Sequence, residues 1–180
     1  MRTKQWWTGS PEANAYYQTE WGRPEHDDQR LFEILALLMF QAGLSWRTVL
    51  RKRPALRQAF AQFEPARVSR MQATDIERLL RDPKLIRNRR KIEAVIHNAQ
   101  VVQHVQTQFG SFDQFVWDIV DGQPIVAPTT DLTKIARQTP LSKKAAIVFK
   151  QNGFTFVGPT LLYSFMQAAG LVDHYLESPK

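Results

Sequence analysis

The chain of 180 residues contains no cysteine. This absence excludes a disulfide framework, a thiol nucleophile and any metal site built from thiolates. No segment approaches the ~18 apolar residues that a membrane-spanning helix needs, and residues 1–7 lack the apolar run of a signal peptide. The histidines are scattered along the chain and show no metal-binding spacing. We therefore expect a cytoplasmic protein with no membrane association, no metal and no other cofactor.

Acidic side chains are in the minority. The chain has 17 Asp and Glu against 24 Lys and Arg, which gives a formal net charge of +7 and an isoelectric point near 9.9. Such an excess favours a polyanionic partner such as nucleic acid. With 43% hydrophobic residues and no internal repeat, the chain is long enough to bury a sizeable core. We expect a single domain over residues 1–180.

Apolar spacing predicts helices along most of the chain. The stretch Leu31–Phe40 is apolar on nearly every face and predicts a buried helix over about residues 28–41. A basic helical segment follows Trp46, and Pro54 is expected to interrupt it. Further helices are expected after Ser111, at Pro140, and from Pro159 to about Gly170. Only residues 154–157 alternate like a strand, which is too short a run to establish one. The predicted class is all-α.

Residues 74–105 predict two helices joined by a tight, basic hairpin. Thr74 and Glu77 have capping-box spacing, Asp82-Pro83 ends the first helix, and apolar residues from Ile92 onward repeat at helical spacing. Backbone N–H groups at the start of the second helix and its dipole are suited to hold a phosphate. The cations expected to approach a DNA backbone are Lys84, Arg87, Arg89, Arg90 and Lys91. The alternative is a solvated turn whose charges have no partner.

The buried helix ends in the sequence Gln41-Ala42-Gly43-Leu44-Ser45-Trp46. A glycine and an exposable tryptophan at this point suggest a place where backbone and an aromatic ring meet a ligand, although a packed helix end would look similar. Enzymes that act on a DNA base commonly receive the flipped base between aromatic rings. Tyr16, Trp21 and Trp46 are candidates for such a pocket, with ordinary core packing as the alternative.

Carboxylates suited to acid–base catalysis are scarce. Glu20, Asp27, Asp28 and Glu33 lie near the start of the buried helix. At such positions carboxylates usually cap a helix or interact with its dipole. We therefore expect these four residues to have structural roles.

Several long strings together resemble the 3-methyladenine DNA glycosylase I family of helix-hairpin-helix DNA glycosylases. They cover nearly the whole chain and include Glu20-Trp21-Gly22, Gln41 to Trp46, Ile86-Arg87, Gly153-Phe154 and Tyr163 to Ala168. The resemblance implies the helix-hairpin-helix DNA glycosylase fold, with the chain ends packed together. It also implies a wedge near Gly43-Leu44 that enters DNA. The implied base pocket is lined by Tyr16, Trp21 and Trp46, with Trp6 and Leu38 also at the base.

The sequence departs from the family pattern at identifiable positions. Leu38 stands where the family has a glutamate that hydrogen-bonds the extruded base. The family's zinc site, made by two Cys and two His, is not retained: Tyr17 replaces one His, and only His174 remains. Pro83-Lys84 and Arg90 stand where glycines are usual in the hairpin. The resemblance therefore implies fold and DNA binding more directly than it implies activity.

On this resemblance, the function is that of a base-excision repair N-glycosylase acting as a monomer on double-stranded DNA. It would flip an alkylated purine such as 3-methyladenine and hydrolyse its N-glycosidic bond. A first alternative is a paralogue that binds damaged DNA without catalysis or with altered specificity. A second is a helical interaction protein with no role on nucleic acid. Salt-dependent DNA affinity separates the last from the others, and release of free base separates the first two.

Overall fold

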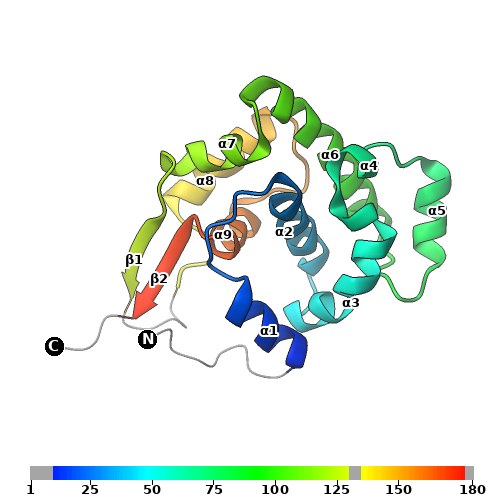
Figure 1. Cartoon of the computed structure of the whole chain (residues 1–180), viewed down its shortest axis with the longest axis horizontal. Helices are drawn as coiled ribbons and strands as arrows, with labels where there is room; N and C mark the ends of the chain where they lie inside the picture. Colours follow the sequence, from blue (N-terminus) through cyan, green and yellow to red (C-terminus); the bar gives the residue numbers. More distant parts are fainter. Residues whose placement is uncertain (1–9, 130–134, 177–180) are drawn as a thin grey trace.

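The computed structural model describes residues 10–129 and 135–176, and helices dominate it. Helix α2 (Asp28–Gln41) lies at the centre of the molecule (Figure 1). Asp27 caps its N-terminus by accepting from the Arg30 N–H, and every residue from Leu31 to Phe40 is buried. This confirms the buried helix that the apolar stretch predicts, because a helix apolar on all faces requires neighbours all round.

The neighbours of α2 come from both halves of the chain. It packs against α3 (Trp46–Ala59), α6 (Arg89–Phe109), α7 (Phe112–Trp117) and α9 (Pro159–Ala168). None of the helices within the described ranges is long and apolar enough to cross a membrane. The junction of residues 42–45 between α2 and α3 is therefore anchored at both ends in the core.

Helix α3 continues through Pro54, so the predicted interruption is wrong. Proline cannot supply the N–H that would bond to the carbonyl four residues earlier. The ring of Pro54 is on the exposed side, while Leu50, Arg53 and Leu56 beside it are buried. Packing of that buried face outweighs the lost hydrogen bond.

The basic side of the molecule is built from consecutive short elements. After α3 come η1 (Ala61–Phe63), α4 (Pro65–Val68) and α5 (Ala73–Arg81), which is joined to α6 by residues 82–88. The capping box of α5 forms between Gln72 and Asp75, not at the predicted Thr74 and Glu77. The two predicted helices are present, and the N-cap of the first lies two residues earlier than expected.

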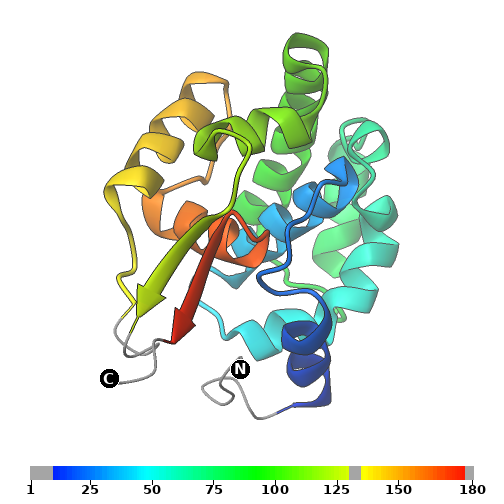
Figure 2. The same cartoon turned by 60° about the vertical axis from the view of Figure 1, so that its left-hand side comes forward.

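The opposite side carries two short strands that sequence spacing did not predict. Residues after α7 form η2 (Asp118–Val120) and β1 (Ile125–Thr129), followed by α8 (Pro140–Gln151), α9 and β2 (Val172–Leu176). The strands pair in parallel with Ile125 opposite Val172 (Figure 2). Residues 154–157 form no strand: Phe156 has a φ of 61°, and the side chain of Asn98 bonds the backbone of Thr155.

Helix α1 (Pro11–Thr19) begins at Ser10, whose side chain accepts from the Ala13 N–H, and it packs on α3. The segment after α1 is held against the end of α9 at Gly170. A side chain at Gly170 would place its Cβ 2.5 Å from the backbone of Arg23 and Pro24. The N–H of Glu25 donates to the Ala169 carbonyl. This close approach fixes the segment that carries Glu20 and Trp21.

Candidate DNA and base-binding site

The hairpin, residues 82–88, is a compact turn anchored in the core. The side chain of Asp82 accepts from the Lys84 N–H at 2.8 Å, and its carbonyl accepts from the Leu85 N–H. Leu85 and Ile86 are buried. Asn88 caps α6 by accepting from the Lys91 N–H. Within the described ranges, the backbone N–H groups of Arg89 and Arg90 have no acceptor, so the positive end of the α6 dipole is open to an anion.

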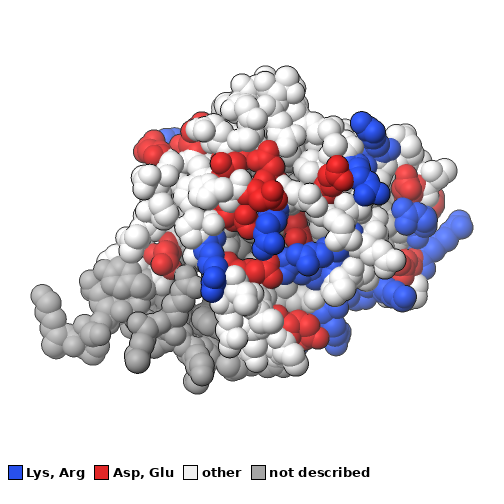
Figure 3. Space-filling view, in the orientation of Figure 1, with Lys and Arg blue, Asp and Glu red and all other residues white. Residues whose placement is uncertain are grey.

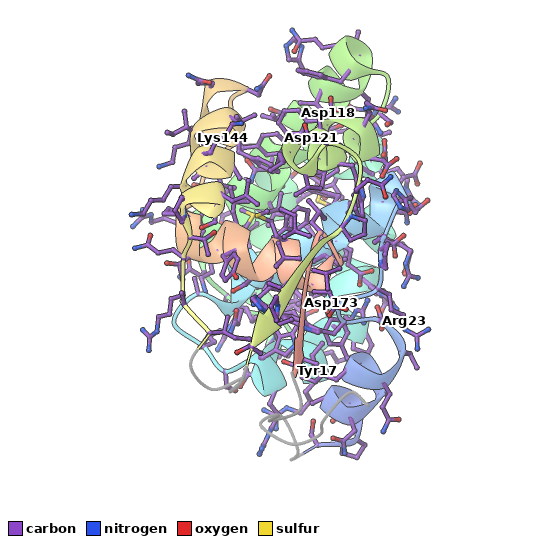
Figure 4. The ribbon with its side chains drawn as sticks, turned by 90° about the vertical axis from the view of Figure 1, so that its left-hand side faces the viewer. Tyr17, Arg23, Asp118, Asp121, Lys144 and Asp173 are labelled. Atoms are coloured by element: carbon purple, nitrogen blue, oxygen red, sulfur yellow. The ribbon has the colours of Figure 1, made fainter. Side chains whose placement is uncertain are left out.

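Cations surround the open end of α6. Lys and Arg side chains gather on the side of the molecule that carries α3 and α5 (Figure 3). The side seen in Figure 4 carries the carboxylates Asp118, Asp121 and Asp173 as well as the cations Lys144 and Arg23. The cations gathered on the side of α3 and α5 would attract a polyanion.

The predicted phosphate-binding cations differ in what they contact. Lys84, Arg87 and Arg90 are exposed, and no ion pair holds them in the part of the chain that the structure describes. Arg89 is also exposed but pairs with Glu77 and with Glu93. Its charge is therefore partly neutralised before any ligand arrives.

Lys91 is not part of this surface, and its predicted role in contacting a DNA backbone is wrong. Its side chain is buried, and its ammonium donates to the carbonyls of Phe40, at 2.7 Å, and Ala42. Burial lowers the pKa of Lys91. The first turn of α6 faces both solvent and core, because successive helix residues point about 100° apart.

The junction between α2 and α3 is a tight turn that exposes a leucine. Ala42 has φ and ψ of −50° and 116°. Gly43 follows with φ of 77°, and the Leu44 N–H donates to the Gln41 carbonyl at 2.7 Å. These are the features of a type II turn, whose third residue needs a positive φ. The side chain of Leu44 is 41% exposed, as are few other large apolar side chains among the described residues.

Four aromatic rings meet beside the junction and form the ring cluster: Tyr16, Tyr17, Trp21 and Trp46. The ring centre of Tyr16 lies 5.3 Å from that of Trp46 and 6.1 Å from that of Trp21, with edge-to-face geometry. The predicted candidates therefore do come together from α1, its following loop and α3. Trp6 lies outside the described residues.

The ring cluster has few free polar groups. Burial raises the pKa of both Tyr16 and Tyr17, so their hydroxyls stay protonated at neutral pH. The indole Nε1 of Trp46 is buried and has no partner among the described residues. The cluster therefore offers aromatic faces and an N–H donor but no carboxylate.

An ion-pair network adjoins Tyr16 of the ring cluster. It is formed by Glu20, Glu33, Arg53 and Arg57. Arg53 donates to both carboxylate oxygens of Glu20 at 2.7 Å and to Glu33 at 2.8 Å. Arg57 donates two further bonds to Glu33. Burial tends to raise the pKa of Glu33, but the bonds from Arg57 and Arg53 outweigh it and hold that pKa below its ordinary value.

This network was not anticipated from the sequence, because Glu33 was expected to be a helix-start carboxylate. It is a buried group within the apolar face of α2 and requires a buried cation. The sequence does contain a pattern that indicates such a partner, because Arg53 and Arg57 are four residues apart and share a helix face. Asp27 does cap α2, and Asp28 accepts from the backbone N–H groups of Phe112 and Asp113 at the start of α7.

A cavity of about 400 Å³ borders Tyr16 on the side of the network. Its lining includes Glu20, Leu50, Arg53 and Arg57, and it does not include Trp21 or Trp46. Leu38 is buried in the main hydrophobic core of α2. The cavity therefore adjoins the ring cluster without lying between the three rings assigned to base binding.

The residues present do not fit the zinc site of the family pattern. The chain has no cysteine, and the Nε2 of His174 is 2.7 Å from the hydroxyl of Tyr163. No group of three His, Asp or Glu side chains suited to a metal occurs in the described ranges. The bond between His174 and Tyr163 joins β2 to α9 without a metal.

The chain is similar to known DNA glycosylases over nearly its full length. A model of the methyladenine glycosylase family matches residues 6–179. The chain is 44% identical to DNA-3-methyladenine glycosylase 1 of Escherichia coli, covering 95% of this chain and 91% of that protein. Its identity to the DNA-3-methyladenine glycosylase of Haemophilus influenzae is 41%, over 98% and 96%.

Similarity in structure agrees with similarity in sequence. A crystal structure of a 3-methyladenine DNA glycosylase I superposes with a TM-score of 0.90 at 47% identity, covering 94% of this chain and 93% of that one. The superposition thus covers nearly the whole chain. The chain therefore belongs to the methyladenine glycosylase family, whose members are helical enzymes that hydrolyse the bond between an alkylated base and DNA.

Proposed function

We propose that this protein is an N-glycosylase that removes 3-methylated purines from double-stranded DNA as a monomer in the cytoplasm. Family membership supports the reaction class. The observation that carries the proposal for this chain is the position of Leu44, which is exposed two residues before Trp46 of the ring cluster, on a turn bonded by Lys91 of α6. An apolar side chain on a tight turn is suited to enter a base stack, and the nearby aromatic rings are suited to receive the base that is extruded.

The residues of this chain would bind phosphate, fill the space in the base stack and stack on the base. The open N-terminus of α6, with Lys84, Arg87 and Arg90, holds a phosphate and fixes the register on the duplex. Leu44 fills the space left by the extruded nucleotide. Tyr16, Trp21 and Trp46 stack on the base, and their π faces attract a methylated purine because it is cationic.

Little acid catalysis is needed for such a substrate. A 3-methylated adenine in DNA carries a positive charge and departs as a neutral base. The electrons of the N-glycosidic bond pass to the base, and water adds to the sugar carbon and loses a proton. The main contribution of the protein would then be to bind the extruded nucleotide and hold its sugar carbon where water can add.

Leu38 favours a second candidate, a protein that binds damaged DNA but excises slowly or with altered preference. Leu38 is buried among apolar residues and cannot accept a hydrogen bond from a base. A polar base edge left unpaired costs about 1–3 kcal/mol. That cost corresponds to roughly tenfold to a hundredfold in the rate of excision.

Chromatography of bases released from methylated duplex DNA tests the proposal. The wild-type chain should release 3-methyladenine, and Trp46→Ala should reduce release far more than duplex affinity, because stacking acts on the extruded base. Tight, salt-sensitive binding with no release of any base by the wild type would leave the non-catalytic binder as the function.

A further inference from the structure

Two buried or half-buried lysines, one on the helix after the junction and one on the helix after the hairpin, each bond the backbone at the other segment. Lys52 of α3 extends to the hairpin, where its ammonium lies 3.2 Å from the Pro83 carbonyl and 2.9 Å from the Lys84 carbonyl. Lys91 of α6 extends to the end of α2, where it donates to the carbonyls of Phe40 and Ala42. The helix that follows the junction thus bonds the backbone of the hairpin, and the helix that follows the hairpin bonds the backbone of the junction.

The contact of Lys91 satisfies an electrostatic need of α2. The last carbonyls of a helix lack intrahelical donors and carry the negative end of its dipole. Helix α2 has no basic residue in its last turn, and the Leu44 N–H bonds Gln41 and not Phe40. Lys91 therefore supplies, from another helix, the cation that this helix end lacks.

The same contact fixes the turn that follows. Ala42 is the second residue of the type II turn, and its carbonyl is one of the two acceptors of Lys91. A rotation of the Ala42–Gly43 peptide would break that bond. Because Gly43 has no Cβ to restrict its backbone, an external contact is needed to hold one conformation.

We propose that Lys91 is a positioning residue that holds the turn carrying Leu44 in one position relative to the hairpin. Leu44 would then enter the base stack at a fixed distance from the phosphate that the hairpin binds. This inference rests on the proposed function. It assigns to Lys91 no contact with DNA. A loss of its ammonium would leave the hairpin able to bind phosphate and the turn free to move.

The test compares Lys91→Met with Lys84→Met, the same chemical change at a buried and an exposed lysine of one segment. For Lys91→Met we expect undamaged-duplex affinity within twofold of wild type and an unchanged salt slope. At saturating DNA, base release should fall at least tenfold. Lys84→Met should instead weaken duplex binding and lower the salt slope by about one, because a phosphate contact is lost.

Base extrusion is measured separately with a duplex that carries 2-aminopurine beside a tetrahydrofuran abasic-site analogue. Insertion of Leu44 should raise the fluorescence of the wild-type complex, Leu44→Ala should abolish the gain, and Lys91→Met should reduce it severalfold. This measurement needs no chemistry, so a wild type that extrudes without releasing base contradicts the proposed function alone. No gain with the wild type overturns the inference about Lys91.

Chemical rescue separates positioning from mere folding. Because the chain has no cysteine, Lys91→Cys carries one thiol, which 2-bromoethylamine converts in the unfolded chain to a side chain that ends in an ammonium. After refolding, this product should recover most of the fluorescence gain, whereas the neutral iodoacetamide product should not. Equal behaviour of the two products, or a reduced salt slope for Lys91→Met, would overturn the inference.

Discussion

The guanidinium of Arg53 lies over the ring of Tyr16, with its central carbon 5.4 Å from the ring centre. The same guanidinium donates to Glu20 and to Glu33, so one side chain of α3 is joined to α1, to α2 and to the segment before Trp21. The orientation of a ring in the proposed base pocket is therefore tied to a buried ion-pair network. Disturbance of the network should affect both stability and base release.

Arg53→Met should lower the free energy of unfolding by about 1.5–3 kcal/mol, because Glu20 loses its two bonds at 2.7 Å and Glu33 keeps only those from Arg57. The control is Arg78→Gln, since Arg78 pairs with Asp75, outside the network, and its side chain is 59% exposed. Loss of that surface pair should cost less than about 1 kcal/mol. Urea unfolding of both variants measures the difference, and equal costs would show that the network contributes no more than a surface pair.

Stability should decrease in acid through Glu33. Its folded pKa is below the ordinary value of 4.5, because bonds from Arg57 and Arg53 outweigh the effect of burial. A depressed folded pKa contributes stability that is present above pH 4.5 and is lost as the pH falls through the folded pKa. The wild type should therefore exceed Glu33→Gln in stability at pH 6, with the difference shrinking below pH 4.5. A constant difference across urea titrations at pH 6, 4 and 3 would contradict this.

Neighbouring arginines of α6 should contribute unequally to DNA binding. Arg90→Ala should lower the slope of log affinity against log salt by about one, because its free charge displaces counterions from the duplex. Arg89→Ala should have a smaller effect, since Arg89 already pairs with Glu77 and Glu93. Fluorescence anisotropy with undamaged duplex over a range of salt measures both slopes. A larger change for Arg89→Ala would mean that these ion pairs open when DNA binds.

Leu38→Glu should produce opposed effects on stability and activity. Position 38 is buried in the hydrophobic core, and none of the described contacts of α2 would bring a cation to a carboxylate there. The protein should therefore be less stable. The new acceptor should nevertheless raise the release of 3-methyladenine above that of the wild type. Leu38→Met, which conserves volume and adds no acceptor, should change neither quantity strongly. Release unchanged by Leu38→Glu would show that position 38 does not face the base.

Local sequence determined most of the helical framework. Helix α2 is marked by its apolar run and by the cap Asp27, and α7 is marked by the cap Ser111. Prolines open α8 and α9. Each of these signals lies within or next to the helix that it marks. Such interactions require no knowledge of distant residues. The resemblance to the family likewise predicts that Tyr16, Trp21 and Trp46 lie together, as their ring contacts show.

Tertiary structure decided which charged residues face solvent. Arg89, Arg90 and Lys91 are adjacent in sequence, yet one is ion-paired, one is exposed and one is buried against the end of α2. Basic composition alone could not separate them. Each outcome depends on the rotation of α6 about its axis relative to helices distant in the sequence.

Contacts between distant residues also explain the other features that the sequence did not predict. Pairing of β1 with β2, and of Glu33 with Arg53, joins residues far apart along the chain, so no local pattern specifies it. Continuation of α3 through Pro54 depends on the burial of Leu50 and Leu56 against other elements. By itself, the sequence determined the helices and the chemical groups available. Only the packing of those helices decided which groups are desolvated and paired, because the free energy of a charge depends on its distant neighbours as much as on its own segment.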